Sequence, residues 1–343
     1  MNRRTLLTTV STTTVVTLAG CGSDTTRSPT TEPPRDPGST ETDTSPETAE
    51  PTETGTKQAP TQQAKRALEG AYTGLNDFAM VKGDSVTVSP KIMRLYQGDR
   101  VQKAIVSAEA AIETARDRGD ATDDTLTKFE AAVTLAADVN AQYQALVEGI
   151  LARERWADSF KSAEYTPAAD HIETATTEIQ TAGDAISPIM ESLSDNGTPA
   201  TEVINNADPR LYYDRENILK YTINYLYHAF RGFTHYTEGW ERVTASLTAL
   251  ENGTYGDARS RLEEAKNKYQ ETREILTEER INESNTYVDR MRRVRCLMPG
   301  YIEAVDLYLQ AVTEYEDGNT AKGESLVSDA EARFQTANET CTS

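Results

Sequence analysis

The residues with the most potential for chemistry lie in one long stretch, residues 209–250, PRLYYDRENILKYTINYLYHAFRGFTHYTEGWERVTASLTAL. It holds two of the three histidines, and His235 and Glu238 stand three residues apart, which places both on one face of a helix. An imidazole and a carboxylate in this arrangement can bind a transition metal. The wider face adds tyrosines and glycines, and its members are Tyr221, Tyr225, His228, Gly232, His235 and Gly239.

Three interpretations of this face remain open. The sequence favours a packed interior in which the polar tips of Tyr and His find hydrogen-bond partners. The second is a cavity for a small ligand, lined by rings and made possible by the glycines. The third is a metal site at His235 and Glu238. The stretch GFTHYTE resembles the GxHxxE motif of imelysin-like helical iron-handling lipoproteins, with one extra residue after the glycine, and that resemblance implies an iron-handling role.

The opposite face of the same stretch is apolar. Its residues follow a spacing of four and three, which is typical of a seam buried between helices: Leu219, Ile223, Leu226, Phe230, Phe233, Thr237, Trp240, Thr244 and Leu247. A helix with both faces committed is expected to be central to the domain.

Enzymatic motifs are not found. The chain has no phosphate loop, no GxSxG and no HExxH, and three histidines provide little for acid–base catalysis. We therefore expect neither an enzyme nor a cofactor.

Residues 61–343 predict an all-α fold, because they are rich in Ala, Glu and Gln and carry apolar residues every three or four positions. Breaks are expected near 82–90, 119–122, 163–166, 194–208, 251–255 and 317–319, at Gly, Pro, Asn or Asp. The helices near 123–163 and 209–250 would each reach about 60 Å. The segment DSVTVSP at 84–90 suggests an extended piece.

One pattern follows three of these breaks. Residues 165–179, 255–269 and 320–334 share small and apolar residues at the same spacings, and Ala163, Gly253 and Gly318 stand two residues before each copy. This resembles the turn and second helix of a tetratricopeptide repeat. Small residues at an ordinary helix–helix seam explain the pattern equally well. Either origin predicts long antiparallel hairpins, in a bundle or in a short irregular tetratricopeptide-like array.

The last hairpin predicts a disulfide. A helix from about Pro299, a turn at 317–319 and a returning helix place Cys296 and Cys341 side by side at the open end. On the chain-entropy model, closing this loop contributes about 4 kcal/mol.

The N-terminus predicts export and lipidation. Arg3 and Arg4 precede a short apolar run, as in a twin-arginine signal, and Leu18-Ala19-Gly20-Cys21 resembles a bacterial-type lipobox. Residues 1–20 are thus expected to be a signal peptide, with a lipid on Cys21. Residues 21–60 are rich in Thr, Pro and Glu and predict a disordered stalk before an ectodomain at 61–343.

The net charge of −20, from 55 acidic and 35 basic residues, argues against nucleic acid as a partner. With this acidic composition and its N-terminal motifs, the protein resembles haloarchaeal surface lipoproteins. A local exception is the cluster Arg290, Arg292, Arg293 and Arg295. Salt bridges to acidic neighbours explain it best, and a docking patch for an anionic glycan or lipid head group is the alternative.

Four N-x-S/T sequons, at Asn196, Asn252, Asn282 and Asn338, permit glycosylation. The sequence as a whole favours a protein on the outer face of the cell membrane, anchored by a lipid, whose helical domain binds envelope proteins or glycans. The alternative is a ligand- or metal-capturing lipoprotein that uses Tyr221, Tyr225, His228, His235 and Glu238.

Overall fold

The computed structural model describes residues 59–78, 81–82, 85–86, 88–279 and 287–341, and this part of the chain is all-α apart from one short β-ladder, as expected. The helices are α2 (Pro60–Asp77), α3 (Pro90–Met93), α4 (Gly98–Arg118), α5 (Asp123–Lys161), α6 (Tyr165–Asp184), α7 (Ile186–Val203), α8 (Pro209–Glu251), α9 (Tyr255–Ile275), α11 (Val288–Glu316) and α12 (Thr320–Thr340). The strands are β1 (Val81–Lys82) and β2 (Ser85–Val86), paired antiparallel.

Three long hairpins form most of the domain: α5 with α6, α8 with α9, and α11 with α12. Each copy of the repeated pattern is the second helix of a hairpin, so the prediction of a hairpin used three times is confirmed. The second helices are 20 or 21 residues long, whereas the first helices have 39, 43 and 29. The hairpins are therefore unequal units in a series.

The three hairpin turns share one backbone geometry. Ala163, Gly253 and Gly318 all adopt positive φ angles, of 59°, 71° and 79°. After each, the next amide donates to a carbonyl five residues back, for example Thr254 to Ala249 at 2.9 Å, as in a Schellman motif. Glycine adopts this conformation without strain, whereas the left-handed conformation of Ala163 costs roughly 1 kcal/mol of folding free energy.

Glycines also set how closely the helices of each hairpin approach. A Cβ added at Gly149 would lie 2.9 Å from the Ile179 side chain, at Gly239 2.3 Å from the Tyr269 ring, and at Gly300 2.6 Å from Ala337. Side-chain Cβ atoms in folded proteins essentially never make a non-bonded contact this short, so a larger residue at these positions would push the helices apart. The seam therefore uses small residues on the first helix as well as on the second.

Two helix boundaries differ from expectation. The break expected over 194–208 is confined to 204–208, because α7 continues through Gly197 and Pro199 to Val203. Burial of Ile189, Leu193 and Ala200 outweighs the low helix propensity of those two residues. Likewise α11 begins at Val288, not near Pro299, because Met291, Val294, Leu297 and Met298 bury its first turns.

Two further breaks are not predicted by the patterns above. Ala185 alone separates α6 from α7, and α9 ends at Ile275, well before α11 starts. The polar run TEERINESNT at 277–286 is the sequence signal for the second break.

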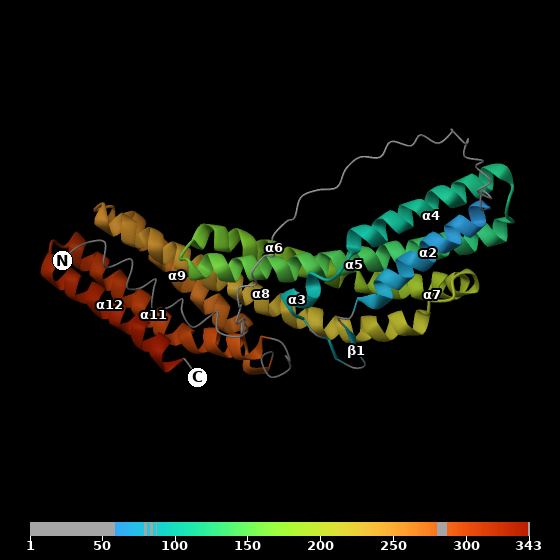
Figure 1. Ribbon diagram of the computed structural model, residues 1–343. Coiled ribbons are helices and arrows are strands. Elements are labelled where there is room, and N and C mark those ends of the chain that lie inside the picture. The colour runs from blue at the N-terminus through green and yellow to red at the C-terminus, as the bar shows by residue number, and fades with distance from the viewer. Residues whose placement is uncertain (1–58, 79–80, 83–84, 87, 280–286, 342–343) are drawn as a thin grey trace, which may run out of the picture.

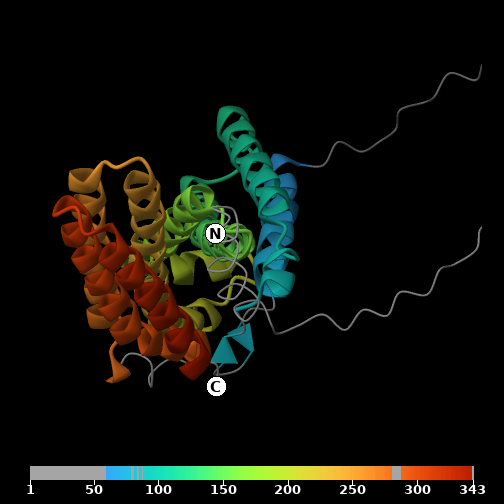
Figure 2. The same ribbon diagram turned by 90° about the vertical axis from the view of Figure 1, so that its left-hand side faces the viewer.

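The domain extends from α2 and α4 at one end to α11 and α12 at the opposite end (Figure 1). Helices α5, α6 and α8 run between these ends, and α7 packs on α5 near α2. In the turned view, α11 and α12 lie on the side of the domain away from α2 and α4 (Figure 2). The predicted disulfide is confirmed there: Cys296 and Cys341 are joined, with Cα atoms 5.8 Å apart. Over the described ranges, no helix is long and apolar enough to cross a membrane.

Candidate functional site

Helix α8 is central to the domain, as predicted. The first seven residues of its predicted seam, from Leu219 to Trp240, are buried, and Thr244 and Leu247 are half-buried. The Trp156 indole of α5 stacks on Phe233 with centroids 5.1 Å apart and donates to Thr237 Oγ1 at 2.9 Å. These contacts fix the rotation of α8 about its axis and so decide which face each remaining side chain occupies.

The glycines of the second face contact α9. The space beside Gly232 is taken by Leu276, and that beside Gly239 by the Tyr269 ring. Tyr236, Tyr269 and Tyr301 meet behind them with ring centroids 5.5–6.5 Å apart. At these two glycines the face is a packed interior and not a ring-lined cavity.

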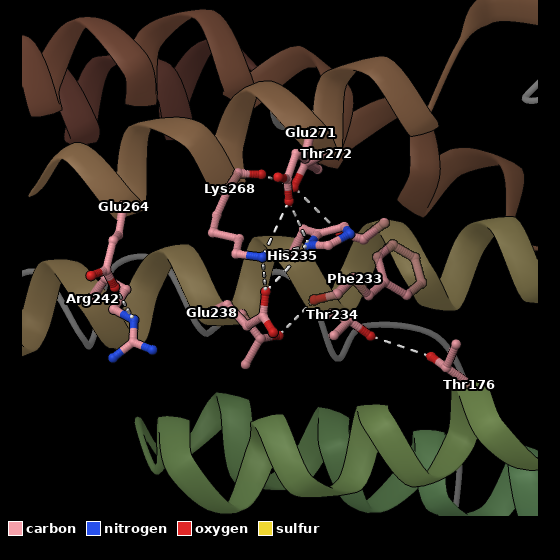
Figure 3. A network of polar contacts seen from close by, with 12 residues as sticks. Thr176, Phe233, Thr234, His235, Glu238, Arg242, Glu264, Lys268, Glu271 and Thr272 are labelled. Carbon is pink, nitrogen blue, oxygen red and sulfur yellow. Dashed lines mark hydrogen bonds and ion pairs between the residues drawn. The ribbon is translucent and has the colours of Figure 1, made fainter. Parts of the chain in front are cut away.

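His235 and Glu238 lie together, as their spacing predicts, in a charged network between α8 and α9 (Figure 3). His235 Nδ1 is 3.2 Å from Glu238 Oε2 and 3.0 Å from Glu271 Oε2. The Lys268 ammonium lies 3.0 Å from Glu238 and 3.2 Å from Glu271. The network thus has a cation of the chain itself between its two carboxylates.

Glu238 and Lys268 stabilise each other's charged form in this network. The bond from His235 lowers the pKa of the Glu238 carboxyl, against the effect of burial, and Lys268 lowers it further. Burial disfavours the charge on Lys268, but Glu238 and Glu271 more than offset it and its pKa is raised. Within the described residues, no group of three or more His, Cys, Asp or Glu side chains is arranged to hold a metal ion. Lys268 Nζ lies 3.4 Å from His235 Nδ1 and 3.0 Å from Glu238 Oε2, so the ammonium group stands where a metal bound by those two side chains would lie.

The other members of the predicted face lie elsewhere along the helix. Tyr221 is 14 residues before His235, about 20 Å away at the rise of an α-helix, and 67% of it is exposed. Tyr225 and His228 lie between them, both half-buried. The structure therefore separates the proposed ligand face into a closed charged network and an open tyrosine end.

The open end borders a groove of about 550 Å³, which we name the Tyr221 groove. It forms where α6 ends at Asp184 and α7 starts at Ile186, against the N-terminal half of α8. Ile179, Ile186 and Ile223 provide its apolar floor. Its rim carries the rings of Tyr221 and Tyr227 and the polar side chains Gln180, Asp184, Lys220 and Asn224.

The polar rim is not engaged within the protein. Within the described part of the chain, the side chains of Gln180, Asp184, Lys220 and Asn224 make no hydrogen bond or ion pair. All four are exposed. The groove thus offers amide, carboxylate and ammonium groups to a ligand without breaking an internal contact.

A second ionisable site, missed by the sequence analysis, is buried one turn before the seam. Glu216 is fully buried, and its Oε2 accepts a 2.7 Å hydrogen bond from Gln142 Nε2 of α5. Its Oε1 and Gln142 Oε1 have no partner in the described structure. The adjacent Arg215 donates instead to the carbonyls of Leu75 and Asn76 in α2. Burial raises the pKa of Glu216 to about 7.

The arginine cluster is divided by the fold. Arg290 and Arg293 are half-buried, and the Arg290 guanidinium lies 6.0 Å from the Tyr287 ring centroid. Arg292 and Arg295 face a smaller hollow of about 300 Å³ beside Cys296, which Arg273 also lines. Arg295 forms an ion pair with Glu278, as the salt-bridge interpretation predicts.

The sequons differ in exposure. Asn252 is exposed at the end of α8, Asn196 is half-buried in α7, and Asn338 is buried with its Nδ2 donating to Phe334 O at 2.9 Å. Asn252 therefore offers the most accessible attachment point of the three. Asn282, Cys21 and the signal and stalk residues up to 58 lie outside the described residues.

No family model, no curated protein and no solved structure matches the chain.

Proposed function

We propose that the protein is a lipid-anchored cell-surface binding protein whose helical domain holds an envelope component in the Tyr221 groove. The observation that carries this proposal is the groove itself, where an exposed aromatic ring and four unengaged polar side chains surround an apolar floor. Such a combination is typical of binding sites, because the floor and rings supply contact area and the polar groups supply orientation.

The N-terminal pattern supports the location. The paired arginines and the LAGC stretch agree with export and lipidation at Cys21, and the Cys296–Cys341 disulfide suits an oxidising compartment. The acidic composition agrees with a high-salt exterior, as in haloarchaeal surface lipoproteins.

Binding is favoured over catalysis by the composition of the groove. Its lining includes a single carboxylate, Asp184, and no histidine. Asp184 and the one base of the lining, Lys220, are both exposed and make no ion pair with each other, so the groove offers neither a paired acid and base nor an activated nucleophile.

Two measurements test the proposal. Cys21→Ser should move the full chain from the membrane fraction into the medium, whereas Thr56→Ser should leave it in the membrane. Envelope washed free of lipid should then retain the purified full chain, and Tyr221→Ala should release it. Tyr213→Ala is the matched control, since Tyr213 is also exposed on α8 but lies outside the groove. Equal retention of the two tyrosine variants, or no retention of the unaltered chain, would contradict the proposal.

A further inference from the structure

The Tyr221 groove has the chemistry of a site for a neutral saccharide. We infer that its ligand is an uncharged oligosaccharide of the cell envelope, held with a pyranose ring against Tyr221. This inference rests on the proposed function and narrows it to one class of ligand.

Size and shape agree with a sugar. The groove volume of about 550 Å³ falls within the range of small-ligand sites, which span roughly 300–1,000 Å³. It lies open along one side of α8, so a chain of sugars can enter without a terminal residue being enclosed. The groove lies where α6 and α7 meet at Ala185.

The polar rim matches hydroxyl groups. A sugar hydroxyl both donates and accepts, and so do the carboxamides of Gln180 and Asn224. Asp184 adds an acceptor and Lys220 adds a donor. Because none of the four is engaged within the described structure, each is free to bond a hydroxyl.

The aromatic rings match the other surface of a sugar. The C–H groups on a pyranose face carry partial positive charge because each carbon bears oxygen, and the face of a tyrosine ring carries the negative part of its quadrupole. Tyr221 and Tyr227 stand at the rim on α8, with Tyr221 67% exposed. Large aromatic side chains elsewhere in the core, such as Trp156, Trp240 and Tyr301, are fully buried.

Charge selects a neutral ligand. One acid and one base line the groove, so the site itself carries no net charge. An anionic polymer would meet Asp184 and a chain of net charge −20, and a cation would meet Lys220. A docked helix would need a long apolar stripe, but the floor offers three isoleucines between polar rims. A ligand that is apolar on its faces and polar around its edge fits best.

The test is a glycan array probed with the full chain purified in detergent, followed by calorimetric titration of the sugars that bind. The array carries neutral oligosaccharides of glucose, galactose, mannose and N-acetylglucosamine, with sialylated and sulfated chains for comparison. Binding to neutral chains is expected, and Tyr221→Ala and Asn224→Ala should each weaken it at least tenfold. Tyr213→Ala should bind as the unaltered chain does, and circular dichroism should show all three variants folded.

Binding to charged chains alone, to no chain, or equally by Tyr221→Ala and the unaltered chain would overturn the saccharide inference. Retention on washed envelope, measured in parallel, separates this failure from that of the proposed function. If the envelope retains the chain through Tyr221 but neutral oligosaccharides do not compete, the ligand is not a neutral sugar and the binding role stands. If the envelope does not retain the chain, the binding role itself fails.

Discussion

The two halves of α8 each contain a glutamate in contact with another helix, and the pKa values of these two carboxyls shift in opposite directions. Glu216, near its start, is fully buried beside a single amide, and its pKa is raised to about 7. Glu238, about six turns later, lies between His235 and Lys268, and its pKa is lowered. The contrast shows that the pKa of a carboxyl in this domain depends on its partners and its burial together. Burial raises the pKa of both carboxyls, and only at Glu238 do the contacts, from His235 and Lys268, outweigh burial.

The same division holds for the glycine and aromatic residues. At the C-terminal half, the Tyr269 ring fills the space beside Gly239, so the helices are in full contact. At the N-terminal half, Tyr221 is mostly exposed and stands beside the open groove. The C-terminal half of α8 is therefore closed against α9, whereas the N-terminal half leaves an accessible groove.

The strongest test of this contrast is Glu216→Gln. The folded pKa of about 7 exceeds the usual value of 4.5, so the folded state binds more protons than the unfolded state between those pH values. Stability should therefore fall as the pH rises from about 4.5 to 7, by roughly 3 kcal/mol in all. Glutamine does not ionise and can also donate toward Gln142 Oε1. Denaturant unfolding from pH 5 to 9 should show the variant more stable than the unaltered protein above pH 7, with a weaker dependence on pH because only Asp138, Glu331 and other carboxyls still titrate. If the free energy of unfolding changed with pH in the same way in both proteins, Glu216 would not be a buried carboxyl with a raised pKa.

A methyl group at Gly239 tests the closed half. Its Cβ would lie 2.3 Å from the Tyr269 ring, which has no room to move because it is fully buried. We expect Gly239→Ala to lower the free energy of unfolding by about 2 kcal/mol. Gly256→Ala is the control, since no atom lies within 4 Å of its added Cβ and α9 should gain up to about 1 kcal/mol in helix propensity. Similar thermal midpoints for the two variants would show that α8 and α9 have room for a methyl group between Gly239 and Tyr269.

Glu238→Gln should have a smaller effect of the opposite sign to Glu216→Gln. Its lowered pKa means that the carboxylate stabilises the fold above about pH 4.5 and that this stabilisation is lost as the pH falls. Because about a third of the side chain is exposed, we expect a loss of at most about 1 kcal/mol at pH 7. High salt should reduce the loss by screening. A gain in stability, measured by the same unfolding series, would show that the contacts from His235 and Lys268 do not stabilise the Glu238 carboxylate.

Tyr221→Ala should have the smallest effect on stability. Most of the ring is in solvent, so the free energy of unfolding should change by less than about 0.5 kcal/mol. A loss of several kcal/mol in thermal unfolding would mean that Tyr221 supports the core and would remove the distinction between the open and closed halves.

Much of the fold is predictable from the sequence because its signal is periodic. The pattern at 165–179, 255–269 and 320–334 marks the second helix of each hairpin, and the cysteines mark the ends of the last one. The errors arise where tertiary burial overrides a local preference. Pro199 and Pro299 both lie inside helices because apolar neighbours on the same helices are buried.

The candidate site was only partly predictable. The spacing of His235 and Glu238 places them together, but their partners Lys268 and Glu271 belong to another helix. The groove depends on α6 and α7, whose break at Ala185 carries no strong signal. Glu216 was detectable: continuing the seam backward from Leu219 by three and then four residues reaches Glu216 and Tyr212, both buried.

The position of the disulfide has a mechanical consequence. Helix α2, the first described helix, and the hairpin of α11 and α12 lie at opposite ends of the domain (Figure 1), and the Cys296–Cys341 bridge joins the two helices of that hairpin at the end away from their turn. A force applied between the start of α2 and the Tyr221 groove on α8 does not pass through that hairpin. Three hydrogen bonds between described residues join α2 directly to α8, from Tyr212 to Asn76 and from Arg215 to the carbonyls of Leu75 and Asn76, beside the contact of the Tyr72 and Tyr212 rings. A covalent bond therefore holds the last hairpin together, whereas only hydrogen bonds and side-chain packing in the described structure hold α2 against α8.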